Sequence, residues 1–76
     1  MIIMADIEKI AVASSNVEAI GYDQQSQILR VWYLNGSVYD YLNVPEIEFE
    51  SLRQAPSVGA YLARSIKGSY PYQKAG

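Results

Sequence analysis

The side chains best suited to bind a ligand are aromatic and basic residues in the C-terminal third. Arg64, Lys67 and Lys74 are interspersed there with Tyr70 and Tyr72. Cations that track phosphates and aromatic rings that stack on bases are the two components of single-stranded nucleic-acid sites, and each stacked base contributes about 1–3 kcal/mol. This pattern predicts contact with RNA or another single-stranded nucleic acid.

Further candidates for the same kind of site lie in the middle of the chain. Tyr39 and Tyr41 are two residues apart, and Arg30 and Trp32 have the same spacing. This spacing puts each pair on one face of a strand, where it could form a stacking platform. The same spacing is also typical of core tyrosines whose hydroxyls reach the rim, and Asp40 lies between the two tyrosines. Both interpretations stay open.

Ser57 and Gly59 form a weaker candidate, for anion binding at a helix start. The free N–H groups of a first helical turn can hold a phosphate or carboxylate. An ordinary N-cap beside a packing glycine explains the same residues. Ser14 and Ser15 are predicted to form a turn or a cap, because no lysine base or oxyanion motif accompanies them.

Missing residue types exclude several kinds of chemistry. The chain has no His and no Cys. It therefore lacks histidine bases, Ser–His triads, cysteine nucleophiles, disulfides and the usual zinc and iron–sulfur ligands. Glu46, Glu48 and Glu50 are two residues apart, and this spacing does not put them on one face of a helix. We predict no metal site, no cofactor and no enzymatic activity.

The composition is that of one small globular domain. Of the 76 residues, 50% are hydrophobic and 18% are charged, with a formal net charge of −2. All eight acids lie in residues 1–50, whereas four of the six cations follow them. This asymmetry indicates either attraction between two parts of the fold or a basic face. The short apolar N-terminus predicts neither a signal peptide nor membrane contact, so a cytoplasmic location is expected.

A three-stranded antiparallel meander sheet followed by two C-terminal helices is expected to position these side chains, as an α+β domain. Strands are predicted over 17–22, 28–34 and 37–42, with a turn at 23–26 and a hairpin loop at Asn35-Gly36. Residues 1–13 fit either a helix or a strand. One helix is predicted to begin at Pro45 and end at Pro56, and Ser57 is predicted to cap the second.

The register of the second hairpin decides which side chains share a face. A two-residue loop pairs Arg30 with Tyr41, and a three-residue loop with Gly36 left-handed pairs Arg30 with Asp40. The second register is favoured because it pairs opposite charges and gathers the odd-numbered apolar and aromatic residues on one face. Trp32 then lies on the other face, either under the N-terminal segment or exposed as a contact residue.

A series of short motifs runs along nearly the whole chain, from residue 12 to residue 74. It comprises Ser14-Ser15, Ala19-Ile20-Gly21-Tyr22-Asp23, Leu29-x-Val31-x-Tyr33, Gly36-Ser37-x-Tyr39-x-Tyr41, Val44-Pro45, Ala55-x-Ser57-x-Gly59, Ile66-Lys67 and Tyr70-x-Tyr72. In this order the motifs resemble the KTSC domain family. That family is named for the C-terminal extension of some lysyl-tRNA synthetases and also occurs as small free-standing proteins of bacteria and phages. Pro56 departs from the pattern and predicts a sharper helix break here.

The length predicts a single domain over residues 1–76, and the resemblance, which covers residues 12–74 of it, implies no enzymatic activity and, through the synthetase context, RNA recognition. The leading expectation is therefore a non-enzymatic accessory module that binds RNA or another nucleic acid. The alternative is a protein–protein adaptor, either a homo-oligomer or a small phage or bacterial modulator. Its support is the acidic pI of about 4.8, the apolar segment Met1–Met4 and the possible exposure of Trp32.

Overall fold

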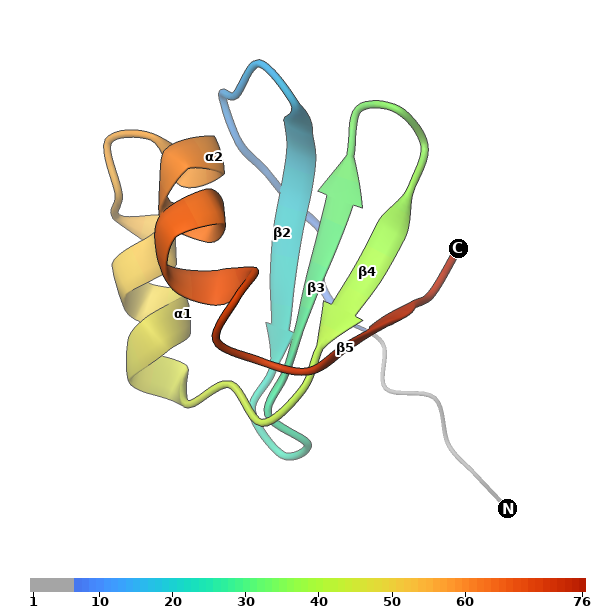
Figure 1. Cartoon of the computed structure of the whole chain (residues 1–76), viewed down its shortest axis with the longest axis vertical. Coiled ribbons are helices and arrows are strands. Elements are labelled where there is room, and N and C mark those ends of the chain that lie inside the picture. The colour runs from blue at the N-terminus through green and yellow to red at the C-terminus, as the bar shows by residue number, and fades with distance from the viewer. Residues whose placement is uncertain (1–6) are drawn as a thin grey trace.

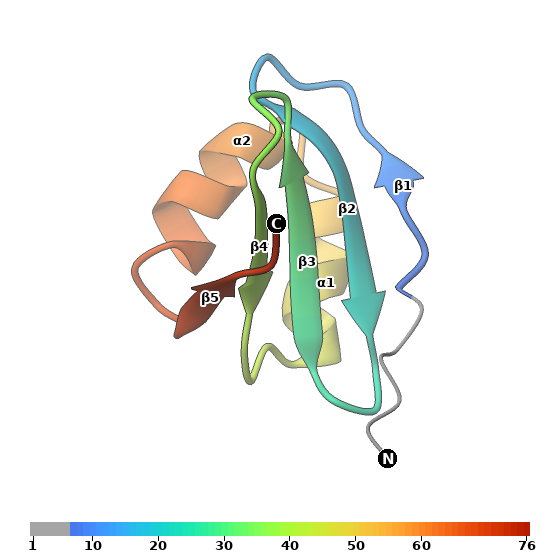
Figure 2. The ribbon, with the colours of Figure 1, turned by 90° about the vertical axis from the view of Figure 1, so that its right-hand side faces the viewer.

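The computed structural model describes residues 7–76 as an antiparallel sheet of five strands with helices on one of its faces (Figure 1). The strand order follows the chain, and the strands are β1 (Ile10–Ala11), β2 (Val17–Asp23), β3 (Ile28–Tyr33), β4 (Val38–Tyr41) and β5 (Tyr72–Lys74). Between β4 and β5 the chain forms α1 (Glu46–Arg53), α2 (Val58–Tyr61) and a π-helical segment (Leu62–Ile66). Figure 2 shows the sheet face that the helices leave uncovered.

Over residues 7–76 the sheet has five strands, whereas the sequence pattern predicts three. The three predicted strands and their meander order are confirmed. The two additional strands are short edges, β1 beside β2 and β5 beside β4. All three residues of β5 are exposed, so β5 has no alternation of buried and exposed positions that a sequence pattern could reveal. Ile10 and Ala11 form a strand, while Met1–Met4 lies outside the described residues.

The β3–β4 hairpin has the three-residue loop that the charge pairing predicted. Gly36 is left-handed, with φ of 92°, and the N–H of Tyr33 donates to the carbonyl of Ser37 at 2.8 Å. Arg30 is opposite Asp40, as expected. The odd-numbered face is buried in the core at Leu29, Val31, Tyr33 and Tyr41.

The two helices are short, and α2 continues directly into the π-helical segment. Pro45 precedes α1, and the Oγ of Ser57 accepts from the N–H of Ala60 at 3.2 Å, as predicted for an N-cap. Beyond α2, the N–H of Lys67 donates to the carbonyl of Leu62 at 2.9 Å, which is the i→i+5 bond of a π-helix. No helix within residues 7–76 has the length and apolar character that crossing a membrane requires.

The hydrophobic core lies between the sheet and the helices. Its largest fully buried side chains are Val17, Ile20, Leu29, Val31, Val44, Leu52, Leu62 and Ile66. The ring of Phe49 on α1 stacks on that of Tyr22 on β2, with 5.0 Å between centroids. Because the core includes Leu62 and Ile66, it holds the π-helical segment against the sheet and sets the position of Lys67, the residue that follows.

Candidate functional site

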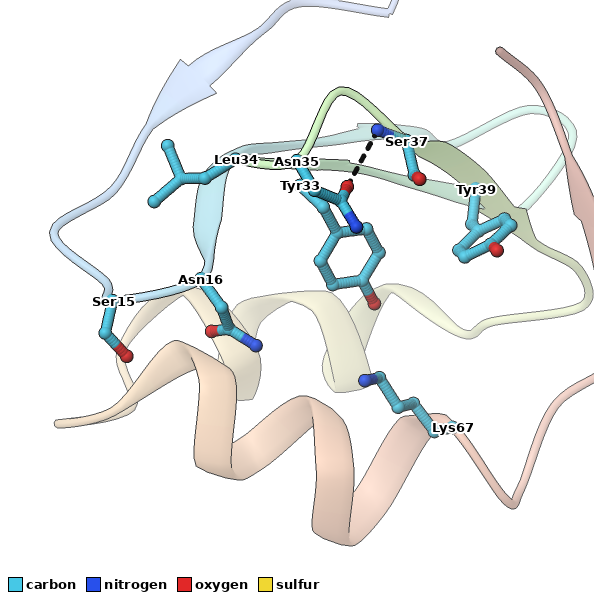
Figure 3. A pocket seen from close by; sticks show the side chains of 8 residues that line it. All are labelled: Ser15, Asn16, Tyr33, Leu34, Asn35, Ser37, Tyr39 and Lys67. Carbon is cyan, nitrogen blue, oxygen red and sulfur yellow. Dashed lines mark hydrogen bonds between the residues drawn. The ribbon is translucent and has the colours of Figure 1, made fainter.

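A groove lies between the β3–β4 hairpin and the end of the π-helical segment (Figure 3). Its volume is about 510 Å³, and it is lined by Ser15, Asn16, Tyr33, Leu34, Asn35, Ser37, Tyr39 and Lys67. A second hollow of about 220 Å³ is lined by Tyr39, Tyr41, Lys67 and Tyr72. The two hollows share Tyr39 and Lys67, and we call them together the tyrosine groove. Among residues 7–76, no carboxylate lines either hollow and no acidic cluster could hold a metal ion.

Four tyrosines form the aromatic part of the groove. Tyr39 meets Tyr33 and Tyr72 edge to face, with centroids 5.8 and 5.7 Å apart, and Tyr41 lies 5.9 Å from Tyr72. Tyr33 and Tyr41 are 8% and 3% exposed, and their hydroxyls are hydrogen-bonded at 3.0 Å. Tyr41 is therefore a core residue. Tyr72 is 60% exposed and Tyr39 is half-buried, so these two rings offer surface to a ligand.

The buried phenols are neutral under ordinary conditions. Burial raises the pKa of Tyr33 above its usual value, and its hydrogen bond with Tyr41 raises it further. Burial also raises the pKa of Tyr41. Because neither hydroxyl ionises near pH 7, the floor of the groove carries no negative charge that would repel an anionic ligand.

Two of the predicted lysines flank the tyrosines. The Nζ of Lys67 lies 5.3 Å from the centroid of the Tyr33 ring, within the range of a cation–π contact. Lys74 is opposite Tyr39 in the β4–β5 ladder, and residues that pair directly point to the same face of a sheet. Neither lysine forms an ion pair with a carboxylate of the described chain. Both charges are therefore available to a phosphate.

The predicted pair Arg30 and Trp32 lies on the opposite face of the sheet. The guanidinium of Arg30 makes a bidentate ion pair with Asp40, at 2.7 and 2.9 Å, and Asp40 is 4% exposed. Trp32 is half-buried, and the Nζ of Lys9 lies 5.5 Å from the centroid of its ring. The charge of Arg30 is thus neutralised by Asp40, and the side chain of Lys9 lies near Trp32.

Arg64 and Tyr70 also have partners outside the groove. The guanidinium carbon of Arg64 lies 5.6 Å from the centroid of the Tyr61 ring. The hydroxyl of Tyr70 donates to the carboxylate of Glu48 at 2.8 Å, and the hydroxyl of Tyr61 donates to the same carboxylate. Glu48 therefore links α1 to α2 and to the segment that leads into β5, a role that no local sequence pattern indicates.

Ser57 and Gly59 make the contacts of an N-cap and a packing glycine. The hydroxyl oxygen of Ser57 accepts a hydrogen bond from the backbone N–H of Ala60. A Cβ on Gly59 would lie only 2.7 Å from the Oδ1 of Asn16 and 3.4 Å from the Oγ of Ser14. The loop before β2 therefore packs closely against the first turn of α2.

Several groove residues were not predicted as site residues. They are Ser15, Asn16, Tyr33, Leu34, Asn35 and Ser37. The sequence marked most of them only as turn or hairpin residues. The N–H of Leu34 donates to the carbonyl of Asn16 at 2.9 Å and so joins the hairpin loop to the loop before β2. This contact links residues that are distant in sequence, and no local pattern signals it.

Fold and groove together define a class of protein, a small α+β domain whose antiparallel sheet carries two short helices on one face. A model of the KTSC domain family matches residues 13–70. The chain therefore belongs to the KTSC domain family, and the resemblance inferred from its motifs is confirmed.

Individual relatives agree with this assignment. The crystal structure of a KTSC domain protein from Yersinia pestis has a TM-score of 0.89 and 31% identity, covering 92% of this chain and 99% of that one. An uncharacterized protein of Stutzerimonas stutzeri is 33% identical over 61 residues, which are 80% of this chain and 86% of that protein. A lysine–tRNA ligase of Nostoc punctiforme is 35% identical over 60 residues, 79% of this chain and 11% of the ligase. This chain thus matches about a tenth of the ligase.

Proposed function

We propose that this domain is a non-enzymatic accessory module that binds single-stranded RNA, or a chemically similar nucleic acid, in the tyrosine groove. One observation carries the proposal. The accessible rings of Tyr39 and Tyr72 line the tyrosine groove together with Lys67, and Lys74 lies opposite Tyr39 in the β4–β5 ladder, while no carboxylate of residues 7–76 lines the groove. Tyrosine rings stack on any base, and lysines neutralise phosphates.

The affinity expected of this site is weak. One or two stacked bases contribute about 1–3 kcal/mol each, and two lysines add a salt-dependent term. The resulting dissociation constant is expected in the micromolar to millimolar range. Such an affinity suits a module that adds to the binding of a larger assembly. The similarity to lysine–tRNA ligases, whose name specifies a tRNA, supports RNA as the ligand.

An amide NMR titration with a short single-stranded RNA tests this proposal. We expect shifts at Tyr39, Lys67, Tyr72 and Lys74 that decrease as salt is added. For single strands, log K falls with log salt with a slope of about −0.7 per phosphate neutralised. The double variant Lys67→Ala/Lys74→Ala should therefore weaken binding and reduce the slope by about 1.4.

A charge-matched control separates the groove from net charge. Lys9 and Arg53 form ion pairs with Glu18 and Glu50, at 2.7 and 2.9 Å, and neither lines the groove or pairs with a groove residue in the β4–β5 ladder, as Lys74 does with Tyr39. Lys9→Ala/Arg53→Ala should leave the affinity and the salt slope close to those of the wild type. Equal weakening by both double variants would mean that net charge alone drives binding. Unchanged binding by the groove variant would refute the nucleic-acid assignment.

A protein partner is the second candidate, and it rests on the exposed edge strand β5. Within residues 7–76, its three residues pair with β4 on one side and with no strand on the other. The free backbone groups of an edge strand can add a strand from another chain, including a second copy. This candidate predicts dimers in light scattering at high protein concentration. A monomer at all concentrations would refute its homo-oligomeric form.

A further inference from the structure

The hollow of about 510 Å³ forms the polar end of the tyrosine groove. Asn35 lines this end, and a hydrogen bond determines how its side-chain amide is oriented. Its Oδ1 accepts from the backbone N–H of Ser37 at 2.9 Å (Figure 3). A backbone N–H can only donate, so the side-chain oxygen must face Ser37. The amide nitrogen of Asn35 is then left for the groove, and Figure 3 shows it on the side of the Tyr33 ring.

The orientation of Asn16 follows from the hydroxyl of Ser14. This Oγ accepts from the backbone N–H groups of Asn16 and Val17, at 3.3 and 3.2 Å, and these two bonds use both of its lone pairs. Its own hydrogen is donated to the Oδ1 of Asn16 at 3.1 Å. The amide nitrogen of Asn16 therefore points away from Ser14, and Figure 3 shows it on the side of Tyr33 and Lys67.

Gly59 makes room for this arrangement. The Oδ1 of Asn16 lies where a side chain at position 59 would begin, since a Cβ there would be 2.7 Å from it. With glycine at this position, Asn16 can hold its hydrogen bond to Ser14 and keep its nitrogen toward the groove. Gly59 is thus a positioning residue for a groove donor.

Three nitrogen donors consequently face one space from three separate elements. Asn16 comes from the loop before β2, Asn35 from the β3–β4 hairpin, and Lys67 from the end of the π-helical segment. The hydroxyls of Ser15 and Ser37 line the same space. Nitrogen donors that include a cation, with no carboxylate from the described part of the chain beside them, suit an anion that has several acceptor oxygens.

We propose that this end of the tyrosine groove is a phosphate subsite, in which Asn16, Asn35 and Lys67 hold the phosphate of a nucleotide whose base stacks on Tyr39. The nucleotide as the source of the phosphate rests on the proposed function. Tyr39 lines both hollows, so a base on its ring adjoins the subsite. Stacking on Tyr39 would position only the base. The subsite would also position the phosphate of the same nucleotide unit.

Amide NMR titrations with inorganic phosphate, adenosine 5′-monophosphate and adenosine test the subsite. Asn16→Asp and Asn35→Asp keep the acceptor oxygen that each loop needs and replace the groove-facing donor with a negative oxygen. Each should weaken the binding of phosphate and of the monophosphate by about tenfold or more. Adenosine, which has no phosphate, should bind all variants equally.

Asn43→Asp is the matched control, because Asn43 is an exposed turn residue outside the groove lining. It should bind the monophosphate as the wild type does. Amide dispersion and the urea midpoint will show that each variant is folded, and Lys67→Gln provides a third test that leaves both loops unchanged. The subsite is refuted if the monophosphate binds no better than adenosine, or if the three groove variants bind it as tightly as the wild type.

The RNA titration separates this proposal from the proposed function. RNA binding that depends on Lys74 and Tyr72 but is unaffected by Asn16→Asp, Asn35→Asp and Lys67→Gln would refute the subsite alone. Monophosphate binding that the two asparagine variants weaken, without any binding of RNA strands, would support the subsite and refute the nucleic-acid function alone.

Discussion

Replacing Gly59 with alanine tests whether the packing of α2 controls the groove. The added methyl group would lie 2.7 Å from the Oδ1 of Asn16, whereas ordinary contacts begin at 3.4 Å. The obstacle is the end of a flexible side chain, so we expect the amide of Asn16 to swing away. It would then lose its hydrogen bond with Ser14 and its orientation toward the groove.

Two effects of this change on stability oppose each other. Loss of the exposed hydrogen bond between Ser14 and Asn16 costs about 0.5–1.5 kcal/mol. Alanine reduces the freedom of the unfolded chain and so stabilises by about 0.4–1 kcal/mol, since Gly59 does not have a positive φ. The free energy of unfolding should therefore change by less than about 1 kcal/mol. Binding of adenosine 5′-monophosphate should weaken about tenfold, because one of the three donors is lost.

Urea denaturation measures the first quantity, and an NMR titration measures the second. Gly68→Ala is the control, because a Cβ at Gly68 meets nothing within 4 Å and its φ is not positive. It should leave monophosphate binding unchanged. Wild-type binding by Gly59→Ala would refute the reasoning. A loss of stability as large as that of a core truncation, about 2–5 kcal/mol, would also refute it, because the loop would then be unable to yield.

Three further changes test contacts that hold the domain together. Asp40→Ala leaves the guanidinium of Arg30 without its buried partner and should lower the free energy of unfolding by about 2–3 kcal/mol, as measured by urea denaturation. An unchanged free energy of unfolding would show that this ion pair does not stabilise the domain. Burial raises the pKa values of Tyr33 and Tyr41, so above pH of about 10 the native state binds more protons than the unfolded state and stability should fall as pH rises. Replacing both tyrosines with Phe should be nearly neutral at pH 7 and should reduce that alkaline fall; a fall as steep as in the wild type would assign it to other groups. Glu48→Ala removes the acceptor that two tyrosine hydroxyls share and should cost about 1–3 kcal/mol, whereas an unchanged melting temperature would show that these bonds add little.

Local sequence patterns were sufficient to predict the central sheet and its hairpin register. Strand alternation, the Asn35-Gly36 turn signal and the opposite charges of Arg30 and Asp40 are local features, and each depends on residues that are neighbours along one hairpin. The same locality explains why the N-cap at Ser57 was predicted correctly. Family membership was also evident, because it depends on the order of motifs and not on their contacts in space.

Which of the candidate residues lie close together depends on the folded chain as a whole. It brings Lys67 and Lys74 to Tyr39 and Tyr72, and it places Arg30 on the opposite face of the sheet in an internal ion pair. It also made a strand of the exposed segment Tyr72–Lys74, which lacks a strand pattern of its own and depends on pairing with β4.

The polar end of the groove depends most strongly on the tertiary fold. Asn16 and Asn35 look like ordinary turn residues in the sequence, and Gly59 like an ordinary helix glycine. They act together only because the loop before β2 packs on α2 and is hydrogen-bonded to the hairpin loop. Contacts between such distant segments depend on how the whole core packs, and local sequence patterns do not encode that packing.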